Sequence, residues 1–538
     1  MAIVTVKALS FSYPTANTDA LTDVSFALDE GSLNLLVGAT GSGKSTLLRL
    51  LKPELAPYGK RRGEINYAGL SDPPAPGEIG FVGQDPNTGI VTDRVYAELA
   101  FAPELMGLSK NEVRLRVGET ASYFGLGDLF ERDTESLSGG EKQLLTLAAA
   151  AAADPKFMLL DEPTAMLDPI AADRFFETLE RIRRDFGVTV LLAEHRFAPV
   201  YARADRVLAL DGGRLIATAD PIAAAKTLKG TVLAGALPVE ARLWKGFGCP
   251  GDCPKDLAAG KKLFDERRVR DLPEESPETE EKETVLSAKD LTFCYQKNAP
   301  PAIDDLTLDV KAGEHLCVLG ENGAGKTTLL LLLAGLRPPL SGKVRFRGRA
   351  LKDYRRGSLY VNGVALLPQD PGALFLKSTV LEDLVDAAPG KRDEAEKAAR
   401  ELAEEYGIAK LLGANPLDLS GGEKQLCGLV KLLLRAPEVL LLDEPTKGLD
   451  PAGKRLLRET VARLTAEGKA VVTVTHDVEF AAGAAQRCAF LFRGQLLALD
   501  APRAFFAKNR FYTPAASRLL PGALTVGDLL AVCGEADV

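Results

Sequence analysis

The sequence predicts an α/β protein with two copies of one fold, each a mostly parallel sheet core with an inserted helical subdomain. Several motifs recur along the chain at one spacing. Within each copy, short apolar segments alternate with segments of helical period, and glycine-rich turns separate them. This order is typical of strands and helices that alternate in a parallel sheet.

The repeat is defined by motifs that return 282 residues later. GATGSGKST begins at Gly38 and its counterpart GENGAGKTT at Gly320, while LSGGEKQ begins at Leu137 and again at Leu419. LLDEPT also occurs twice in this register. Unrelated motifs that keep one spacing indicate two copies of one domain.

We predict a first domain over residues 1–240, a linker over 241–285, a second domain over 286–508 and a C-terminal tail over 509–538. The linker contains GCPGDCPKD and RDLPEESPETEEKET. These segments are rich in proline and charge and have little periodicity, so we expect the linker to be exposed. The tail contains LTVGDLLAVCG, which favours a short helix.

Each element of the first copy has its own signal. VSFALDEGSLNLLVG is strand-like and runs into a glycine-rich turn, and STLLRLLK then has helical spacing. KFMLLDEP and VTVLLAEH are short apolar runs of the kind found in buried parallel strands. NEVRLRVGETASYFGL has a helical period, and we expect it to belong to the inserted helical subdomain.

Composition limits the function classes. The chain has 538 residues and a net charge of -8 at pH 7, which argues against a surface that binds nucleic acid throughout. Seven scattered cysteines indicate a reducing compartment, and for Cys249 and Cys253 in CPGDC we favour a loop over a metal site. We see no secretory signal and no apolar run near the roughly 20 residues that span a bilayer. Any work at a membrane is therefore expected to depend on partners.

Two strand–GxxxxGK[ST]–helix segments predict phosphate loops that bind ATP. Their glycines let backbone N–H groups turn onto phosphate oxygens, and the following helix adds its positive end. Lys44 and Lys326 are expected to reach the β- and γ-phosphates, and Ser45 and Thr327 to offer hydroxyls to Mg²⁺. A glycine-rich turn with an exposed lysine is the alternative, and two matches in register disfavour it. The predicted ATP-binding residues here are Gly38, Thr40, Gly41, Ser42, Gly43, Lys44, Ser45 and Thr46, and Gly320, Asn322, Gly323, Ala324, Gly325, Lys326, Thr327 and Thr328.

Four acids at the ends of two apolar runs are candidates for metal binding and catalysis. Asp161 and Asp443 end the runs, where a carboxylate can hold Mg²⁺. Glu162 and Glu444 follow immediately and are candidates to orient or polarise the attacking water. The alternative, a pair of acids that cap the next turn, is disfavoured because the pair recurs at the same distance from each phosphate loop.

Histidines and tyrosines also recur at matching positions. His195 and His476 end the next apolar runs, and we favour a γ-phosphate sensor over a purely structural role for both. His315 has no counterpart, and we interpret it as structural. Tyr13 and Tyr295 precede the phosphate loops, and each offers an aromatic face that can stack on adenine, although packing is the commoner use of such a residue.

The order of phosphate loop, glutamine (Gln84 and Gln369), LSGGEKQ, LLDEPT and strand-end histidine resembles ATP-binding-cassette ATPases, which are phosphate-loop NTPases. The resemblance implies ATP hydrolysis with Mg²⁺, catalysed by Glu162, His195, Glu444 and His476, and two domains that pair head to tail. It also implies that each ATP is shared between a phosphate loop and the LSGGE segment of the other domain: Lys44 with Ser420, Gly421 and Gly422, and Lys326 with Ser138, Gly139 and Gly140.

Further roles follow from the same resemblance. Asp168 and Asp450 match the segment that communicates across the paired domains, and Gln84 and Gln369 match the loop that contacts both Mg²⁺ and the membrane partner. The implied Mg²⁺ site therefore comprises Ser45, Gln84, Asp161, Thr327, Gln369 and Asp443. All these motifs are intact in both copies, so we predict two hydrolytically competent sites.

A narrower resemblance concerns the segments after the glutamines. GQDPNTGIVTDRVYAELAFAPELMGLS looks like the corresponding region of energy-coupling-factor ATPases, and PQDPGALFLKSTVLEDL is a looser match. This implies importers of vitamins, vitamin precursors or transition-metal ions. The implied partners are an integral membrane coupling protein and a small substrate-binding membrane subunit, with the ATPase peripheral on the cytoplasmic face of the cell membrane. Asp85 and Asp370 either meet basic helices of the partner or belong to solvated loops.

Two alternatives remain open at this point. One is a tandem ATPase of another ABC transporter, and the other is a soluble tandem cassette protein that acts on ribosomes. The acidic, proline-containing linker disfavours the ribosomal class, which usually carries a long basic helical linker, and no nucleic-acid partner is expected.

Overall fold

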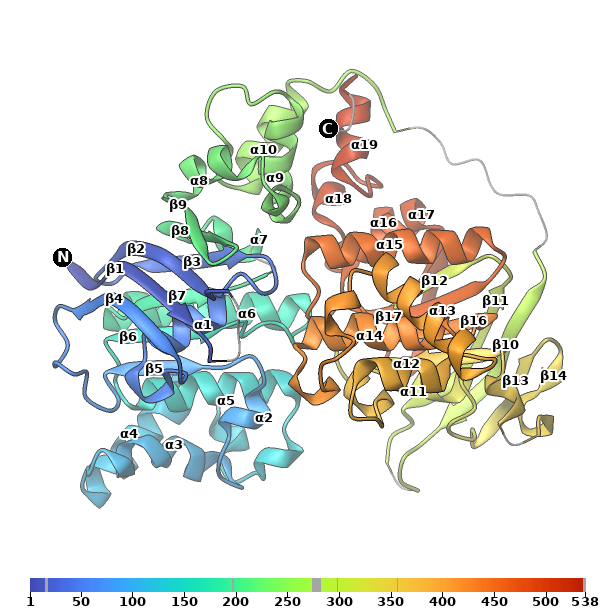
Figure 1. The fold of residues 1–538 in the computed structure, drawn as a ribbon, viewed down its shortest axis with the longest axis horizontal. Coiled ribbons are helices and arrows are strands. Elements are labelled where there is room, and N and C mark those ends of the chain that lie inside the picture. Colours follow the sequence, from blue (N-terminus) through green and yellow to red (C-terminus); the bar gives the residue numbers. More distant parts are fainter. Residues whose placement is uncertain (15–17, 196–197, 273–281, 298, 356, 536–538) are drawn as a thin grey trace. The chain divides into compact units, whose positions relative to one another are not determined.

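The computed structural model describes residues 1–14, 18–195, 198–272, 282–297, 299–355 and 357–535. The chain separates into two compact units, Met1–Leu263 and Phe264–Val538. Each unit contains one six-stranded sheet and one smaller sheet, and the sequence colours of Figure 1 distinguish the units. The predicted α/β fold with two copies is confirmed.

The core of the first unit is a six-stranded sheet in the order β5-β6-β7-β3-β8-β9. Its strands are parallel except for β9, which runs antiparallel to β8. Every residue of β3, β6 and β7 is buried, which explains why these strands are apolar along their whole length. The strands are β3 (Leu33–Gly38), β5 (Ile79–Val82), β6 (Phe157–Asp161), β7 (Thr189–Ala193), β8 (Arg206–Asp211) and β9 (Arg214–Ala219).

A smaller antiparallel sheet and a set of helices complete the first unit. The small sheet has the order β2-β1-β4, with β1 (Ala2–Ser12), β2 (Leu21–Asp29) and β4 (Lys60–Tyr67). The helices up to residue 228 are α1 (Lys44–Leu50), α2 (Pro86–Gly89), α3 (Val95–Leu105), α4 (Lys110–Tyr123), α5 (Gly139–Ala152), α6 (Pro169–Phe186), α7 (Ala198–Tyr201) and α8 (Pro221–Leu228).

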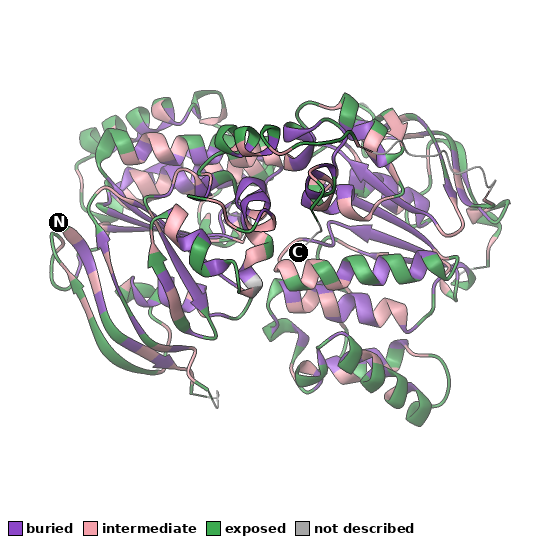
Figure 2. Cartoon of the chain, turned by 90° about the horizontal axis from the view of Figure 1, so that it is seen from above, coloured by how far each residue is buried: buried purple, intermediate pink, exposed green. Residues whose placement is uncertain are grey.

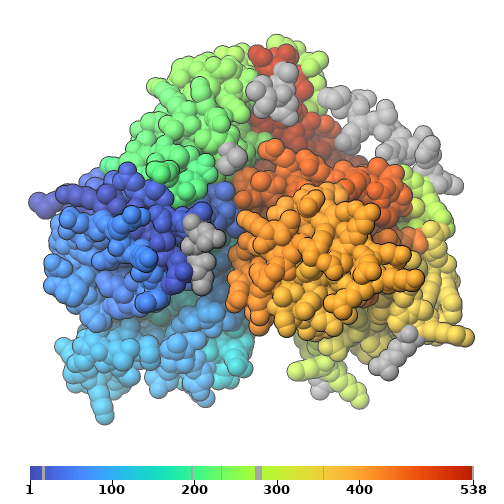
Figure 3. All heavy atoms as spheres, viewed as in Figure 1, coloured from blue at the N-terminus to red at the C-terminus, as the bar shows by residue number. Residues whose placement is uncertain are grey.

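Helices α2 to α5 form the predicted helical insertion between β5 and β6. Helix α4 begins with a capping box in which Ser109 and Glu112 satisfy each other's backbone N–H groups, so the helix has a defined start. Its buried residues Val113 and Val117 join the apolar core that also contains Leu99 of α3. In Figure 3 these helices, coloured light blue to cyan, form the lobe at the lower edge of the first unit.

The second unit repeats this plan with sheet orders β15-β16-β17-β12-β18-β19 and β11-β10-β13-β14. Its strands are β10 (Thr284–Phe293), β11 (Ile303–Lys311), β12 (His315–Leu319), β13 (Ser341–Phe346), β14 (Arg349–Ala350), β15 (Val364–Leu367), β16 (Val439–Asp443), β17 (Ala470–Thr475), β18 (Arg487–Phe492) and β19 (Gln495–Asp500). Its helices up to residue 508 are α11 (Lys326–Leu333), α12 (Val380–Ala387), α13 (Arg392–Glu405), α14 (Gly421–Leu433), α15 (Pro451–Ala466), α16 (Val478–Ala484) and α17 (Pro502–Lys508).

The segment predicted as an exposed linker is folded over much of its length, so that prediction is wrong for residues 241–265. Helices α9 (Val239–Gly246) and α10 (Leu257–Asp265) occupy this region. The side chains of Trp244 and Phe264 are 1% and 0% exposed, and the Trp244 indole N–H donates to the carbonyl of Pro250 at 3.1 Å. The prolines and glycines that suggested a linker form the turn between the two helices. Most of the acidic run that follows, residues 273–281, lies outside the described residues.

The C-terminal tail is part of the second unit. It contains α18 (Ala515–Leu519) and α19 (Val526–Val532), and α19 confirms the helix predicted there. Arg503 of α17 forms an ion pair with Asp528 of α19 at 2.7 Å and donates to the carbonyl of Gly522 at 3.2 Å. Leu524 packs against the apolar core of the unit.

Burial follows the layers of each unit. Figure 2 shows the central strands as buried and the outward faces of the surrounding helices as exposed. Among the described residues, no helix combines the length and apolarity needed to cross a bilayer.

Candidate functional site

In each unit, the loop between a buried strand and the following helix has the backbone of a phosphate cradle. Gly41 and Gly43 have φ values of 77° and 99°, and Gly323 and Gly325 have 84° and 103°, which side chains of L-residues rarely allow. A Cβ atom on Gly43 would also lie 2.6 Å from the carbonyl oxygen of Ala20. Only glycine therefore fits this turn, which leads directly into the N-terminus of α1 or α11.

The loop lysines are buried, and their ammonium groups are held over the cradle. Lys44 Nζ donates to the carbonyls of Gly38 at 2.9 Å and Ala39 at 3.2 Å, and lies 3.9 Å from the Glu162 carboxylate. Lys326 makes the matching contacts in the second unit, including 3.9 Å to Glu444. The tips of both loops, Thr40–Gly41 and Asn322–Gly323, are exposed. The alternative of a glycine-rich turn with an exposed lysine does not hold, because Lys44 and Lys326 are both buried.

Two of the three predicted magnesium ligands of each unit, the hydroxyl and the aspartate, meet at the ends of β6 and β16. Ser45 Oγ donates to Asp161 Oδ1 at 3.1 Å, and burial raises the pKa of Asp161. Burial likewise raises the pKa of Asp443 to about 6, against a hydrogen bond from Thr327 that lowers it. Asp443 Oδ1 is buried and accepts no hydrogen bond within the described part of the chain. A hydroxyl beside a buried, unsatisfied carboxylate oxygen suits a hard cation such as Mg²⁺, so the residues fit the metal.

The two glutamates that follow occupy a strained backbone position. Glu162 has φ 48° and Glu444 has φ 49°, values in the left-handed region that are uncommon outside glycine. The backbone N–H of Glu162 donates to the carbonyl of Ala193, and that of Glu444 to the carbonyl of Val474, both at 2.9 Å. Each glutamate is thereby tied to the neighbouring strand that leads to the histidine.

In the first unit, the Glu162 carboxylate contacts two other residues that the sequence analysis proposed for the site. Its Oε1 lies 2.8 Å from His195 Nε2, and its Oε2 accepts a hydrogen bond from Gln84 Nε2 at 3.1 Å. Burial alone would raise the pKa of Glu162, but His195 and Lys44 outweigh burial and lower it. The carboxylate is therefore held in its charged form, as a group that accepts a proton from water must be.

In the second unit, Glu444 is approached differently. Its Oε2 lies 2.9 Å from His476 Nδ1 and accepts hydrogen bonds from Thr475 Oγ1 at 3.1 Å and from the backbone N–H of His476 at 3.3 Å. Burial acts to raise the pKa of Glu444, and His476 and Lys326 together lower it. Gln369 is exposed.

Sequence reasoning missed the residues that precede the two histidines. Glu194 is 2% exposed, and its Oε1 accepts hydrogen bonds from the Thr164 hydroxyl at 2.6 Å and backbone N–H at 3.1 Å. Its counterpart Thr475 is fully buried and bonds Glu444. The sequence does contain this difference, because AEH in the first copy aligns with VTH in the second copy inside otherwise matching motifs.

The tyrosines and the signature serines take defined positions. The Tyr13 and Tyr295 hydroxyls lie 3.1 and 3.0 Å from the hydroxyls of Thr46 and Thr328, so each ring is anchored beside its own phosphate loop. Ser138 and Ser420 are the N-caps of α5 and α14, each in a capping box with the glutamate three residues later. Gly139, Gly140, Gly421 and Gly422 form the first turns of these helices. The described hydrogen bonds of both serines stay within their own helix starts, not at the phosphate loop of the same unit.

Four aspartates near the site have structural tasks as helix caps. Asp168 caps α6 and Asp450 caps α15 through backbone N–H groups of the first turn. Asp85 accepts from the N–H of Asn87, and Asp370 from the N–H of Gly372, in the turns after the glutamines. These bonds give both acids a local role in their turns, and the predicted contact with basic helices of a partner stays a prediction.

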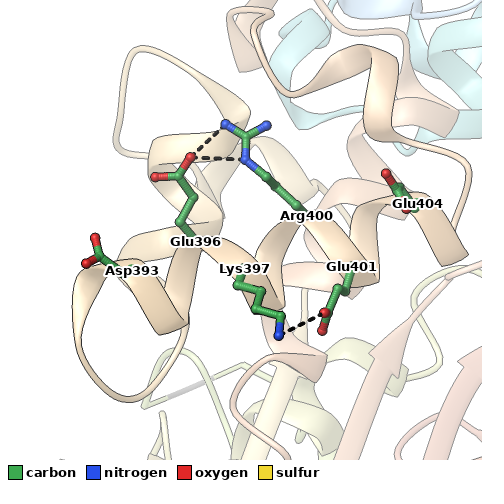
Figure 4. A pocket seen from close by; sticks show the side chains of 6 residues that line it. All are labelled: Asp393, Glu396, Lys397, Arg400, Glu401 and Glu404. Atoms are coloured by element: carbon green, nitrogen blue, oxygen red, sulfur yellow. Dashed lines mark hydrogen bonds and ion pairs between the residues drawn. The ribbon is translucent and has the colours of Figure 1, made fainter.

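A shallow hollow on the second unit lies away from this chemistry. It is formed by one face of α13, where Glu396 pairs with Arg400 at 2.7 Å and Lys397 with Glu401 at 3.8 Å, as Figure 4 shows. Neighbouring turns of a solvated helix neutralise each other in this way. The hollow has no element in common with the phosphate loops.

Family and sequence comparisons match both units of the chain. A family model described as "ABC transporter" matches residues 21–165 and 303–447. A Bacillus anthracis protein named "Putative ABC transporter ATP-binding protein" is 38% identical over 98% of both chains. A similarly named protein from Streptomyces avermitilis is 36% identical and covers 92% of this chain and 93% of its own. Among solved structures, cbiO1 of Clostridium perfringens, part of the ABC transporter complex cbiONQ, is 26% identical over 42% of this chain and 92% of its own, with a TM-score of 0.38.

Two phosphate loops, two buried acid pairs and a family match in each unit lead to one assignment. The chain belongs to the ABC transporter family, as an ATP-binding subunit whose two cassettes hydrolyse ATP with Mg²⁺.

Proposed function

We propose that Glu162 and Glu444 orient the water that attacks ATP in their respective sites, and that His195 and His476 position the γ-phosphate beside them. The short contacts between each acid and its histidine, 2.8 and 2.9 Å, support this assignment. When bound, Mg²⁺ supplies charge neutralisation at the phosphates; its proposed ligands are Ser45, Gln84 and Asp161, and Thr327, Gln369 and Asp443.

Each ATP is proposed to be shared between the phosphate loop of one cassette and the signature serine of the other. The exposed helix starts at Ser138 and Ser420 support this, since a serine hydroxyl and glycine N–H groups at a helix N-terminus form an anion site. Loss of the γ-phosphate would then favour separation of the paired cassettes.

We infer that the chain energises an importer of the energy-coupling-factor type for a vitamin, a vitamin precursor or a transition-metal ion. Its partners would be an integral membrane coupling protein and a small substrate-binding membrane subunit, with the chain peripheral at the cytoplasmic face. The observation that carries the coupling is the 3.1 Å hydrogen bond from Gln84 to Glu162. Through it, a movement of the exposed glutamine loop reaches the acid directly.

The segment after each glutamine is braced to the helical insertion, which supports transmission of such a movement. Glu98 of α3 is 4% exposed and accepts from the backbone N–H groups of Val91 at 3.1 Å and Thr92 at 2.9 Å. Asp383 of α12 accepts from the N–H of Leu376 at 3.0 Å. Hydrogen bonds therefore tie the loop to the insertion in both units.

The insertion of the first unit also exposes apolar surface. Phe101 and Leu105 are one helical turn apart on α3, and their side chains are 43% and 74% exposed. Val91, 62% exposed, lies in the braced loop. Exposed apolar side chains near a loop that contacts the catalytic acid favour a protein partner at this surface.

Affinity purification of the tagged chain from membranes, followed by identification of integral proteins, tests the proposal. We expect a coupling protein and a small membrane subunit to co-purify. Phe101→Glu with Leu105→Glu should lower their recovery at least about tenfold while ATP turnover of the isolated chain persists. Leu497→Glu on β19, whose leucine is 58% exposed, is the matched control and should retain the partners. Recovery of ribosomes, or of the membrane proteins of another transporter class, would overturn the importer assignment.

A further inference from the structure

The residue before each histidine differs between the two units in a way that changes what holds the catalytic acid. In the second unit this residue is Thr475, the last residue of β17, and it is fully buried. In the first unit it is Glu194, directly after β7 and 2% exposed. Both side chains, Thr475 and Glu194, are buried.

Thr475 is built to donate to Glu444. Its hydroxyl accepts a hydrogen bond from the backbone N–H of Asp477 at 3.0 Å, which leaves the hydroxyl proton for Glu444 Oε2 at 3.1 Å. A β-branched side chain in a strand has few rotamers, so the direction of this bond is fixed by the sheet. Glu444 is thus steadied from the interior of its own sheet.

Glu194 cannot do the same for Glu162. An ionised carboxylate only accepts hydrogen bonds, and two carboxylates repel each other at close range. Glu194 Oε1 instead takes both donors of Thr164, at 2.6 and 3.1 Å. The amide donor to Glu162 Oε2 comes from Gln84, whose side chain lies on an exposed loop.

We propose that Thr475 is a positioning residue for Glu444, and that Glu194 at the same place in the first unit makes Glu162 depend on Gln84. The inference rests on the catalytic roles proposed above for the two glutamates. It makes the two ATP sites inequivalent. Both acids contact a histidine, but Glu444 Oε2 also has a hydroxyl donor fixed in the sheet, whereas Glu162 Oε2 has an amide donor only when the glutamine loop is in place.

The first test uses the purified full-length chain and ATP turnover with Mg²⁺. Thr475→Val keeps the shape of the side chain and removes the hydroxyl, so it should lower kcat by about twofold if the sites act independently and about tenfold if they are coupled. KM for ATP should change less than twofold, because the acid does not hold the ground-state nucleotide. Thr475→Ser should restore kcat. Equal losses in the valine and serine variants would show that only packing matters and would overturn the proposal.

The second test places a threonine at position 194 of the first unit, the counterpart of Thr475. Measured at saturating Mg²⁺, which offsets the loss of a proposed metal ligand, Gln84→Ala should still lower kcat, and adding Glu194→Thr should recover at least half of that loss by giving Glu162 a hydroxyl donor. Gln369→Ala, the matched change in the second unit, should have a smaller effect than Gln84→Ala. No recovery with Glu194→Thr, or equal effects of the two glutamine changes, contradicts the proposal. The recovery by Glu194→Thr and the comparison of the two glutamine variants test the proposal even if Thr475→Val does not fold.

These outcomes are separate from those of the proposed function. Neither test needs a membrane partner, so an importer assignment that fails leaves them valid. If the variant with both Glu162→Gln and Glu444→Gln still hydrolyses ATP, the catalytic roles themselves are wrong, and that result is distinct from a silent Thr475→Val.

Discussion

At the scale of single residues, the two glutamates combine strained backbones, burial and contact with a histidine. Strain of this kind persists only where the surroundings hold it, and here the backbone bonds to Ala193 and Val474 do so. His195 and His476 contact the carboxylates at 2.8 and 2.9 Å. The arrangement favours one function for both acids.

Replacement of both acids by their amides, Glu162→Gln with Glu444→Gln, should lower ATP turnover by at least about 100-fold. ATP binding should remain, because the phosphate loops and their lysines are unchanged. Phosphate release and retained nucleotide after gel filtration measure the two effects. Glu131→Gln, at an exposed position, is the control and should leave both unchanged. Undiminished turnover in the double variant would remove the assigned roles.

The sequence identified the residues of this cluster because phosphate binding restricts residue types at fixed spacing, and the roles of these residues stay proposals. It did not predict how the acids are held. Gln84 contacts Glu162, whereas Thr475 contacts Glu444, although the motifs of the two copies match. Such pairings depend on side-chain directions across neighbouring strands and loops, which a linear motif does not encode. The same holds for Asp85 and Asp370, whose capping bonds appear only in the folded chain.

At the scale of elements, one acid of the C-terminal helix α19 makes several of the polar contacts that hold the helix in the second unit. Asp528 accepts from the backbone N–H groups of Leu524 at 2.7 Å and Thr525 at 3.1 Å, and pairs with Arg503. Asp528→Ala should therefore destabilise this region by about 2 kcal/mol. Hydrogen exchange of α19 measures the loss as faster exchange of its amides.

A surface pair supplies the control for that prediction. Asp500 pairs with Lys508 at 2.8 Å, but the lysine side chain is 71% exposed, so Asp500→Ala should cost less than about 0.5 kcal/mol. Equal protection of α19 in the Asp528 variant and the unmodified chain would contradict the anchoring role.

Strand β12 contains a buried histidine that should make the second unit sensitive to acid. Burial lowers the pKa of His315 from 6.5 to about 4, while its ring contacts the carbonyl of Ala484 at 2.8 Å and the hydroxyl of Thr473 at 2.9 Å. Between pH 6.5 and pH 4, His315 binds a proton in the unfolded chain but stays neutral in the folded chain. Stability from this source is therefore present above pH 6.5 and is lost as the pH falls towards 4, by about 3 kcal/mol in total.

Hydrogen exchange of β12 between pH 7 and pH 4 measures this loss once intrinsic exchange rates are corrected for. His315→Gln, which does not titrate in this range, should show a flatter dependence on pH than the unmodified chain. Parallel pH profiles for the two proteins would exclude His315 as the source.

The elements themselves were predicted unevenly. Strands β3, β6 and β7 were clear because full burial makes them apolar throughout. Helices α9 and α10 were missed because prolines, glycines and charges between them dominate the local composition. Their stability comes from the burial of a few large side chains such as Trp244, a tertiary effect that periodicity over short segments does not reveal.

At the scale of the whole molecule, two complete phosphate loops in one chain predict two nucleotides bound per chain. Lys44→Ala and Lys326→Ala should each lower the stoichiometry from about two to about one, and both together should abolish binding, since each ammonium serves its own loop. Calorimetric titration with Mg²⁺ and a non-hydrolysable ATP analogue measures the number. Lys110→Ala, at an exposed position of α4, is the control. Loss of both nucleotides from either single variant would show that the sites fill only together.

The backbone bonds from Glu162 to Ala193 and from Glu444 to Val474 have a mechanical consequence. Each bond joins an acid to the neighbouring strand, and the histidine follows two residues after the accepting carbonyl. The acid and the histidine therefore belong to one rigid part of the parallel sheet. Moving the acid relative to the histidine would break a backbone hydrogen bond in the buried interior of the sheet. Regulation of hydrolysis is therefore expected to act through groups that the surrounding loops bring to the acids, such as Gln84 at Glu162.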